Sequence, residues 1–327
     1  MKKRIALIYG GDSSEVEVSI LSGKHVAANI DREKYEVYEV LLRGTRWSLC
    51  SSDSDFSPIA EIDKSDFSCC VEGEKIKFDL AFIMIHGTPG ENGLLQAYFE
   101  MMKIPFTTCS SFVSAMTFNK YACKTFLRDT GVKMAREVYL QKTDKYSVKD
   151  IVDKLNLPLF VKPSAGGSSF GISKVKKAEE LENSICEAFK EGDTIIVEEF
   201  IKGREMTQGV FCSKGKIILL PVTEIISKNE FFDYEAKYLG ASDEVCPAHI
   251  SDEITEKINE ETQKIYHHFG CKGLVRVDYI LRGKDVYFLE INTVPGMTKM
   301  SLVPQQVCTA GINMMDFFTI LIEEACS

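Results

Sequence analysis

Residues 161–171 read VKPSAGGSSFG, and this stretch decides what kind of fold the chain is expected to have. A short apolar run leads into Lys162 and then into a loop of glycines and serines. Glycine permits backbone conformations that other residues avoid, and successive free amides in such a turn can surround an anion. The stretch therefore predicts a strand followed by a phosphate-binding loop, although the same composition is also typical of a surface turn.

Neither of the two common nucleotide-binding motifs is present. Lys162 precedes the glycines, whereas the lysine of a Walker A loop follows them. Near the N-terminus, YGGDSS lacks the glycine spacing of a dinucleotide-binding fingerprint. The absence of this glycine fingerprint disfavours a dehydrogenase.

Composition points to a globular protein. The chain has 327 residues, 45% of them hydrophobic and 27% charged, which is compatible with two or three domains. Its net charge of −9 disfavours binding to nucleic acid or to an anionic membrane. The apolar run IALIY is too short for a signal-peptide core, and no run is long enough for a membrane-spanning helix. We therefore expect a cytoplasmic protein whose 11 cysteines are reduced.

Strand and helix patterns divide the chain into three predicted domains, at residues 1–119, 120–202 and 203–327. The first alternates strands and helices, which predicts an open α/β sheet with parallel strands. In it, Ser14 and Glu17 predict a capping box. A single helix is predicted for residues 114–131, and a single strand for residues 216–225.

Two strand patterns near the C-terminus carry a second signal. Alternate residues of a strand share a face, so Arg276 and Asp278 point the same way, as do Glu290 and Asn292. If the two strands pair as a hairpin, two carboxylates, an amide and a guanidinium converge. Oxygen ligands of this kind suit Mg²⁺ bound together with substrate phosphates. A solvated polar face with salt bridges is the other interpretation, and the tight turn predicted after Asn292 favours the metal site.

Several motifs together resemble a known family. VKPSAGGSSFG, IIVEEFIKGRE, FFDYEAKY, RVDY and LEINTVPGMT are similar to motifs of ATP-grasp enzymes. With GGDSSEVEVS and HGTPGENGLLQ, the chain from Gly10 to Pro304 resembles the D-alanine:D-alanine ligase family. The resemblance implies an α/β, three-domain ATP-grasp architecture with an N-terminal open α/β domain, and ATP held between the central and C-terminal domains. It also implies ATP-dependent ligation of two D-alanine molecules through an acyl phosphate, for peptidoglycan precursors. Mg²⁺ is the implied cofactor, with two ions and Mn²⁺ as a substitute, and a homodimer is the implied assembly.

The resemblance further implies roles for individual residues. The implied ATP contacts are Lys120, Lys162, Ser169, Glu198, Glu199, Phe200, Ile201, Glu205 and Lys237, and the implied metal ligands are Asp278, Glu290 and Asn292. The implied catalytic and substrate-binding groups are Glu15 with Ser168 and Tyr238 at the first D-alanine, His86 beside it, Arg276 and Gly296 at the oxyanion, and Ser301 and Leu302 at the second carboxylate. No base for the attacking amine can be assigned.

Two alternatives and one question of affinity stay open at this stage. D-alanyl-D-lactate and D-alanyl-D-serine ligases share most of these motifs, and the EAKY segment with Tyr238 favours D-alanyl-D-alanine as the product. A nucleotide-binding regulatory module without turnover is disfavoured by the intact Arg276 and Asp278. Pro89, Asn92 and Ala97 depart from the residues usual in the family, which leaves substrate affinity open.

Overall fold

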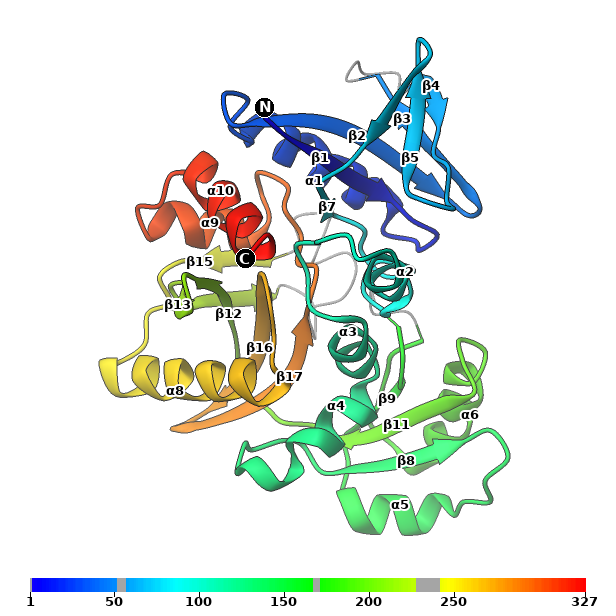
Figure 1. The fold of residues 1–327 in the computed structure, drawn as a ribbon. Coiled ribbons are helices and arrows are strands. Elements are labelled where there is room, and N and C mark those ends of the chain that lie inside the picture. Colours follow the sequence, from blue (N-terminus) through cyan, green and yellow to red (C-terminus); the bar gives the residue numbers. More distant parts are fainter. Residues whose placement is uncertain (1, 52–56, 167–170, 228–241) are drawn as a thin grey trace.

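The computed structural model describes residues 2–51, 57–166, 171–227 and 242–327. These residues form three larger sheets and one small two-stranded sheet, with helices packed around them (Figure 1). The N-terminal sheet is drawn in blue, the second in green, and the third in colours from yellow-green to orange. The architecture is the mixed α/β fold that the sequence predicts.

The N-terminal part of the chain forms a five-stranded sheet with a parallel centre. Its strands are β1 (Lys3–Gly10), β2 (Tyr35–Arg43), β3 (Arg46–Cys50), β4 (Pro58–Glu61) and β7 (Leu80–Ile83), and a separate hairpin pairs β5 (Ser68–Val71) with β6 (Glu74–Lys77). β1 pairs in parallel with both β2 and β7, so the predicted open α/β sheet is confirmed. β1 is buried from Ile5 onward, as expected for a parallel strand covered on both faces. The antiparallel β3 and β4 extend the sheet beyond the prediction.

The helices that follow correct two predictions. They are α1 (Val16–Asn29), α2 (Leu94–Met102), α3 (Ser111–Phe118) and α4 (Lys120–Leu127). The predicted capping box is wrong, because α1 has Glu15 rather than Ser14 at its N-cap position. The single helix predicted for residues 114–131 is also wrong. Asn119 has an extended backbone, and its side chain accepts a hydrogen bond from the Ala122 amide, so that α3 ends and α4 begins there.

The middle of the chain forms a four-stranded antiparallel sheet of order β10-β9-β11-β8. Its elements are β8 (Glu137–Gln141), β9 (Leu159–Pro163), β10 (Ser173–Val175), β11 (Thr194–Glu199), α5 (Val148–Leu155) and α6 (Ala178–Ala188), preceded by the 3₁₀ turn η1 (Arg128–Thr130). The sequence predicts both α-helices and three of these strands, β9, β10 and β11. It does not predict β8. Lys162 therefore lies near the end of a central strand, directly before the small-residue loop.

The C-terminal part forms a six-stranded antiparallel sheet, in which β13 pairs with β12 beside the main order β15-β14-β12-β16-β17. Its elements are β12 (Arg204–Ser213), β13 (Lys216–Leu219), β14 (Thr223–Ser227), β15 (Ser242–Val245), β16 (Val275–Arg282), β17 (Asp285–Asn292), α8 (Asp252–Phe269), α9 (Leu302–Thr309) and α10 (Met314–Ala325). The single strand predicted for residues 216–225 is wrong, because it divides into β13 and β14. Pro221 lies at the break and has no amide hydrogen for a sheet ladder.

One hydrophobic core connects the two ends of the chain. Leu7 and Phe82 of the first sheet pack in the same cluster as Phe317 and Phe318 of α10. Val294, just after β17, belongs to the same cluster. The loop after β17 is therefore held against the N-terminal part, which brings the ends of distant strands to one place.

The three sheets span residues 3–83, 137–199 and 204–292. The predicted domain limits at residues 119/120 and 202/203 stay predictions. Among the described residues, every helix is too short or too polar to cross a membrane.

Candidate active site

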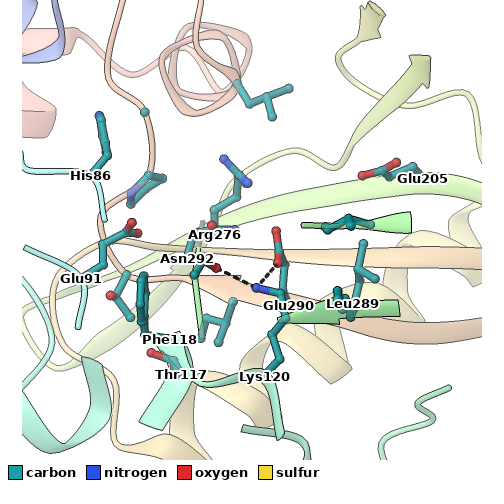
Figure 2. A pocket seen from close by; sticks show the side chains of 18 of the residues that line it. His86, Glu91, Thr117, Phe118, Lys120, Glu205, Arg276, Leu289, Glu290 and Asn292 are labelled. Carbon is teal, nitrogen blue, oxygen red and sulfur yellow. Dashed lines mark hydrogen bonds and ion pairs between the residues drawn. The ribbon is translucent and has the colours of Figure 1, made fainter. Parts of the chain in front are cut away.

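A cavity of about 830 Å³ is lined by residues from all three parts of the chain. This is the size of a site for a nucleotide-like ligand. Figure 2 shows His86 and Glu91 on one side of the cavity, Arg276 and Asn292 near its middle, and Glu205 at the other end. The lining includes these predicted site residues: Glu15, His86, Lys120, Lys162, Glu198, Glu199, Phe200, Ile201, Glu205, Arg276, Glu290, Asn292, Gly296, Ser301 and Leu302.

β16 and β17 form the hairpin that the sequence predicts. Arg276 is paired with Asn292, and Asp278 is paired with Glu290. Directly opposed residues of an antiparallel pair lie on the same face of the sheet. The four side chains therefore converge on one face, while their roles stay predictions.

Asp278 organises its neighbours from behind the cavity surface. It is only 4% exposed. Arg276 donates to both of its carboxylate oxygens, from Nε at 2.9 Å and from Nη2 at 2.8 Å. The Thr207 hydroxyl donates to Oδ1 at 2.5 Å, and Nδ2 of Asn292 donates to Oδ2 at 3.1 Å. These four bonds fill the roughly four acceptor positions of an ionised carboxylate.

The donor chemistry of this face fits Mg²⁺. Glu290 has a side chain that is 25% exposed, and Lys120 approaches it at 3.6 Å (Figure 2). Asn292 uses its amide nitrogen on Asp278, so its oxygen is the atom it can offer to a cation. Glu290 and Asn292 could thus offer oxygen atoms to a cation, whereas Asp278 would have to give up one of its hydrogen bonds to offer a third. Within the described ranges, no group of three carboxylate, imidazole or thiol side chains is placed to hold a metal ion.

A set of buried charges forms the wall beside the small-residue loop. Lys162 Nζ lies 2.5 Å from Oε2 of Glu198, and Lys124 Nζ lies 2.5 Å from Oε1 of the same carboxylate. Burial opposes ionisation of Glu198, but the two lysines together lower its pKa to about 2. Lys120, on the neighbouring α4, donates to the carbonyl oxygen of Gly166 at 2.9 Å. The structure thus brings the two lysines predicted to contact ATP, Lys120 and Lys162, to the cavity, and places Lys124 behind Glu198.

The segment after β11 borders an apolar slot. The rings of Phe160 and Phe200 lie 5.7 Å apart, and Lys174 Nζ lies 4.2 Å from the centre of the Phe200 ring. Glu199 is directed to Arg136, whose Nε donates to it at 2.8 Å, so it differs from its neighbour Glu198 in facing a surface arginine. Phe160, Phe200 and Ile201 line this part of the cavity, and apolar side chains of this kind suit the base of a nucleotide.

The loop after β7 holds His86 against the C-terminal part. His86 Nδ1 lies 2.8 Å from the carbonyl oxygen of Val294, which can only accept, so Nδ1 carries the hydrogen. Burial lowers the pKa of His86, which leaves the ring neutral, and Nε2 accepts from the Ser22 hydroxyl at 3.1 Å. Gly87 follows with φ 69°, and a side chain there would collide with Ser13. His86 therefore joins α1 to the loop after β17, and its predicted contact with substrate stays a prediction.

Glu91 is a site residue that the sequence interpretation missed. It lines the cavity, and its carboxylate accepts from the amides of Gly87 at 2.7 Å and Val294 at 3.3 Å. Desolvation, followed by the nearby charge of Glu15, raises its pKa to about 8. A glutamate between glycine and asparagine in a loop carries no signal of this kind, because the desolvating neighbours come from β17 and α1.

The turn after β17 carries the last predicted group of residues. The amide of Met297 donates to the Ser22 hydroxyl at 3.1 Å, which fixes this turn on α1. A side chain at Gly296 would approach the Ser301 hydroxyl to 3.0 Å, so the turn passes close to the start of α9. Ser301 is the N-cap residue of α9, and Leu302 is its first residue. Free amides at a helix N-terminus favour an anion, which agrees with the predicted carboxylate site.

Four predicted residues lie outside the described ranges. They are Ser168 and Ser169 of the small-residue loop and Lys237 and Tyr238 of the segment before β15. Their predicted roles stay predictions.

Comparison with known proteins matches nearly the whole chain. Residues 4–109 match the family model described as D-ala D-ala ligase N-terminus, and residues 126–323 match the model described as D-ala D-ala ligase C-terminus. A D-alanine--D-alanine ligase from Phocaeicola vulgatus is 46% identical over 324 residues, which cover 99% of each chain.

Two solved structures show the same fold. The VanG D-Ala:D-Ser ligase from Enterococcus faecalis superposes with a TM-score of 0.88 at 31% identity, covering 99% of this chain and 100% of that one. The D-alanine--D-alanine ligase from Bacillus anthracis complexed with ATP superposes with a TM-score of 0.79 at 29% identity, covering 99% and 97%.

The three-sheet fold, with its cavity bordered by the second and third sheets, is that of an ATP-grasp ligase. More closely, the chain belongs to the D-alanine–D-alanine ligase family. It is therefore an ATP-dependent ligase.

Proposed function

We propose that this protein joins two D-alanine molecules to D-alanyl-D-alanine for peptidoglycan synthesis, with conversion of ATP to ADP and phosphate. One observation supports this most directly. A single cavity holds the oxygen-rich β16–β17 hairpin, the lysine-bearing wall of the second sheet, and the carboxylate-bearing loops of the first part. Phosphoryl transfer needs the first two, and recognition of an amino acid needs the third.

The first step activates a carboxylate. A carboxylate oxygen of the first D-alanine attacks the γ-phosphorus of ATP, which releases ADP and leaves an acyl phosphate. Catalysis of such a transfer is mainly positioning and charge neutralisation, for which Lys120, Lys162 and Arg276 supply cations. Asp278, Glu290 and Asn292 would hold Mg²⁺, which neutralises phosphate charge when bound.

The first D-alanine is held by the N-terminal part. Glu15, buried at the start of α1, accepts from its ammonium group, and Ser168 and Tyr238 are its predicted hydrogen-bond partners. The neutral His86 ring and the protonated Glu91 limit the negative charge beside the reacting carboxylate. These groups exclude water from the acyl phosphate on one side of the cavity.

The second step forms the peptide bond. The carboxylate of the second D-alanine is held by the Ser301 hydroxyl and the Leu302 amide at the start of α9. Its amine loses a proton and attacks the acyl carbon, and the oxyanion is stabilised by Arg276 and the Gly296 amide. The tetrahedral intermediate then expels phosphate, which yields the dipeptide.

We also propose that the enzyme uses two Mg²⁺ ions, accepts Mn²⁺ in their place, and acts in the cytoplasm as a homodimer. The dimer is supported by large apolar side chains that are exposed on α2 and α3, two helices that contact each other. These are Leu94, Met101 and Phe112. Equilibrium sedimentation of the purified protein tests this, and a monomer at micromolar concentration would contradict it.

Activity with defined substrates tests the function. With ATP, Mg²⁺ and D-alanine, we expect equal amounts of ADP and D-alanyl-D-alanine. The similarity to a D-Ala:D-Ser ligase makes D-serine and D-lactate the informative alternative acceptors. Product formation that requires either of them would reject the dipeptide assignment.

Arg276→Met tests the site. Loss of one oxyanion donor is expected to lower kcat by about 10²–10³-fold. Arg204→Met is the matched control, because Arg204 also makes a close pair with a carboxylate, Glu224, in the same sheet but is not among the residues that line the cavity. Equal losses of kcat in both variants would show that Arg276 has only a structural role.

A further inference from the structure

We propose that Lys124 is a positioning residue for the nucleotide, which sets the charge of the cavity wall without touching the nucleotide itself. This inference rests on the proposed function. Lys124 lies on α4, and Figure 1 shows α4 next to β8 and β11 of the second sheet. Its side chain is 5% exposed, and it is not among the residues that line the cavity.

The contacts of Lys124 form a chain of alternating charges. Its Nζ lies 2.7 Å from Oε2 of Glu137 and 2.5 Å from Oε1 of Glu198, and it donates to the Ala135 carbonyl at 2.8 Å. The second oxygen of Glu198 holds Lys162 at 2.5 Å. Glu198 and Lys162 line the cavity, whereas Glu137 and Lys124 stand behind them. The order from the back of the wall to the front is therefore Glu137, Lys124, Glu198, Lys162.

The formal charges of these four groups cancel. Two ammonium groups face two carboxyl groups, and all four side chains are largely buried, so each charge needs its partner. Burial raises the pKa of Glu137, and the Lys124 ammonium at 2.7 Å opposes this shift and favours the charged form. Although burial opposes it, the carboxylates of Glu198 and Glu137 raise the pKa of Lys124, which keeps it charged. If Lys124 lost its charge, Glu137 and Glu198 would share one remaining cation, Lys162. The wall would then carry a net negative charge beside the site for a polyphosphate.

Lys124 also fixes the direction of Glu198. With Oε1 held from behind, the carboxylate presents Oε2 to Lys162 at the cavity surface. Lys162 thereby has a defined position next to the small-residue loop before a nucleotide arrives. A preorganised cation loses less conformational entropy on binding than one that must be ordered by the ligand.

The rival interpretation is that Lys124 only holds α4 against the second sheet and has no effect on the nucleotide. It predicts that loss of Lys124 lowers stability and leaves nucleotide affinity unchanged in the folded fraction. The charge-setting interpretation predicts instead that the affinity change is reversed by removing the second carboxylate. The two interpretations thus differ in the behaviour of a double variant.

The experiment measures binding of ADP with Mg²⁺ by calorimetry, without D-alanine, in Lys124→Met, Glu137→Gln and the double variant. We expect Lys124→Met to bind ADP about tenfold more weakly, the size of effect expected for one unit charge at medium range in a partly buried site. The double variant should regain most of this affinity, and Glu137→Gln alone should bind ADP at least as tightly as the wild type. Lys133→Met, which removes a surface lysine, is the matched control and should bind normally.

Unchanged ADP affinity in folded Lys124→Met, or no recovery in the double variant, would overturn the proposal. If Lys124→Met does not fold, weaker ADP binding by Glu137→Gln alone would overturn it. Failure of the proposed function is a separate outcome: ADP affinity would respond as expected, but the wild type would form no dipeptide.

Discussion

Glu198 and Glu91 line the same cavity, but their surroundings act on them in opposite directions. Glu198 lies between Lys162 and Lys124, and its pKa is lowered to about 2 despite burial. Glu91 accepts from two main-chain amides and lies near Glu15, and its pKa is raised to about 8. A glutamate is therefore an anion at position 198, on β11, and a neutral acid at position 91, in the loop after β7.

The comparison shows that the neighbouring groups, rather than the residue type, decide whether a carboxyl group in this cavity is charged. In the second sheet, Glu198 has Lys162 and Lys124 at 2.5 Å, and Glu199 has Arg136 at 2.7 Å. Near Glu91, the charge of Arg276 lowers the pKa only weakly, and Arg276 is already bound to Asp278 through both carboxylate oxygens. A polyanion and a zwitterion can thus be recognised side by side.

The largest expected effect is at Glu198. In Glu198→Gln, Lys162 and Lys124 lose a shared carboxylate, and we expect the free energy of unfolding to fall by about 3–5 kcal/mol, as for other broken buried ion pairs. Urea unfolding measures it. Glu199→Gln is the matched control, because its partner Arg136 is largely exposed and its loss should be much smaller. Similar losses at both positions would remove the basis of the comparison.

Glu91→Gln should show an effect that depends on pH. A carboxyl group whose pKa is raised on folding stabilises the folded state below its unfolded pKa of about 4.5, and this contribution is lost as pH rises through about 8. Stability of the wild type should therefore fall relative to Glu91→Gln by about 4 kcal/mol between pH 5 and pH 9, at roughly 1.4 kcal/mol for each pKa unit crossed. Urea midpoints across this range measure the difference, and parallel curves would show that Glu91 ionises normally.

Glu198 should behave with the opposite sign. Because its pKa is lowered on folding, its contribution is present above pH 4.5 and is lost as pH falls through about 2. Acid unfolding of the wild type should accordingly be steeper than that of Glu198→Gln. Equal acid transitions would contradict the assignment of Glu198 as an ion.

The smallest expected effect is at Lys133, whose ammonium lies 2.6 Å from Asp285. This distance is close to that between Lys124 and Glu198, but about half of each side chain is exposed to water. Solvent screens such a pair, so Lys133→Met should leave the urea midpoint unchanged within error. A loss as large as that of Glu198→Gln would show that distance, rather than burial, controls these ion pairs.

Motifs with regular periodicity could be predicted from the sequence, and boundaries that depend on single side chains could not. The β16–β17 hairpin followed from the alternation around Arg276 and Asp278, because both strands carry a two-residue repeat. The break at Asn119 was missed, because the apolar pattern continues through it and the cap forms only with the Ala122 amide. The break at Pro221 had a local signal, the missing amide hydrogen, which the surrounding apolar run concealed.

The sequence by itself determined the family of this chain, the strand that leads into the small-residue loop, and the residues that face one another on the third sheet. These depend on residue types at short spacings, which are visible in a linear chain. The tertiary structure alone decided which carboxylates are charged, because desolvation and ion pairing depend on partners from distant segments. Lys124 and Glu198 are separated by 74 positions, and Glu91 and Val294 by 203. Only the packing of α4 on the second sheet, and of the loop after β17 on the first part, brings those partners within a hydrogen bond.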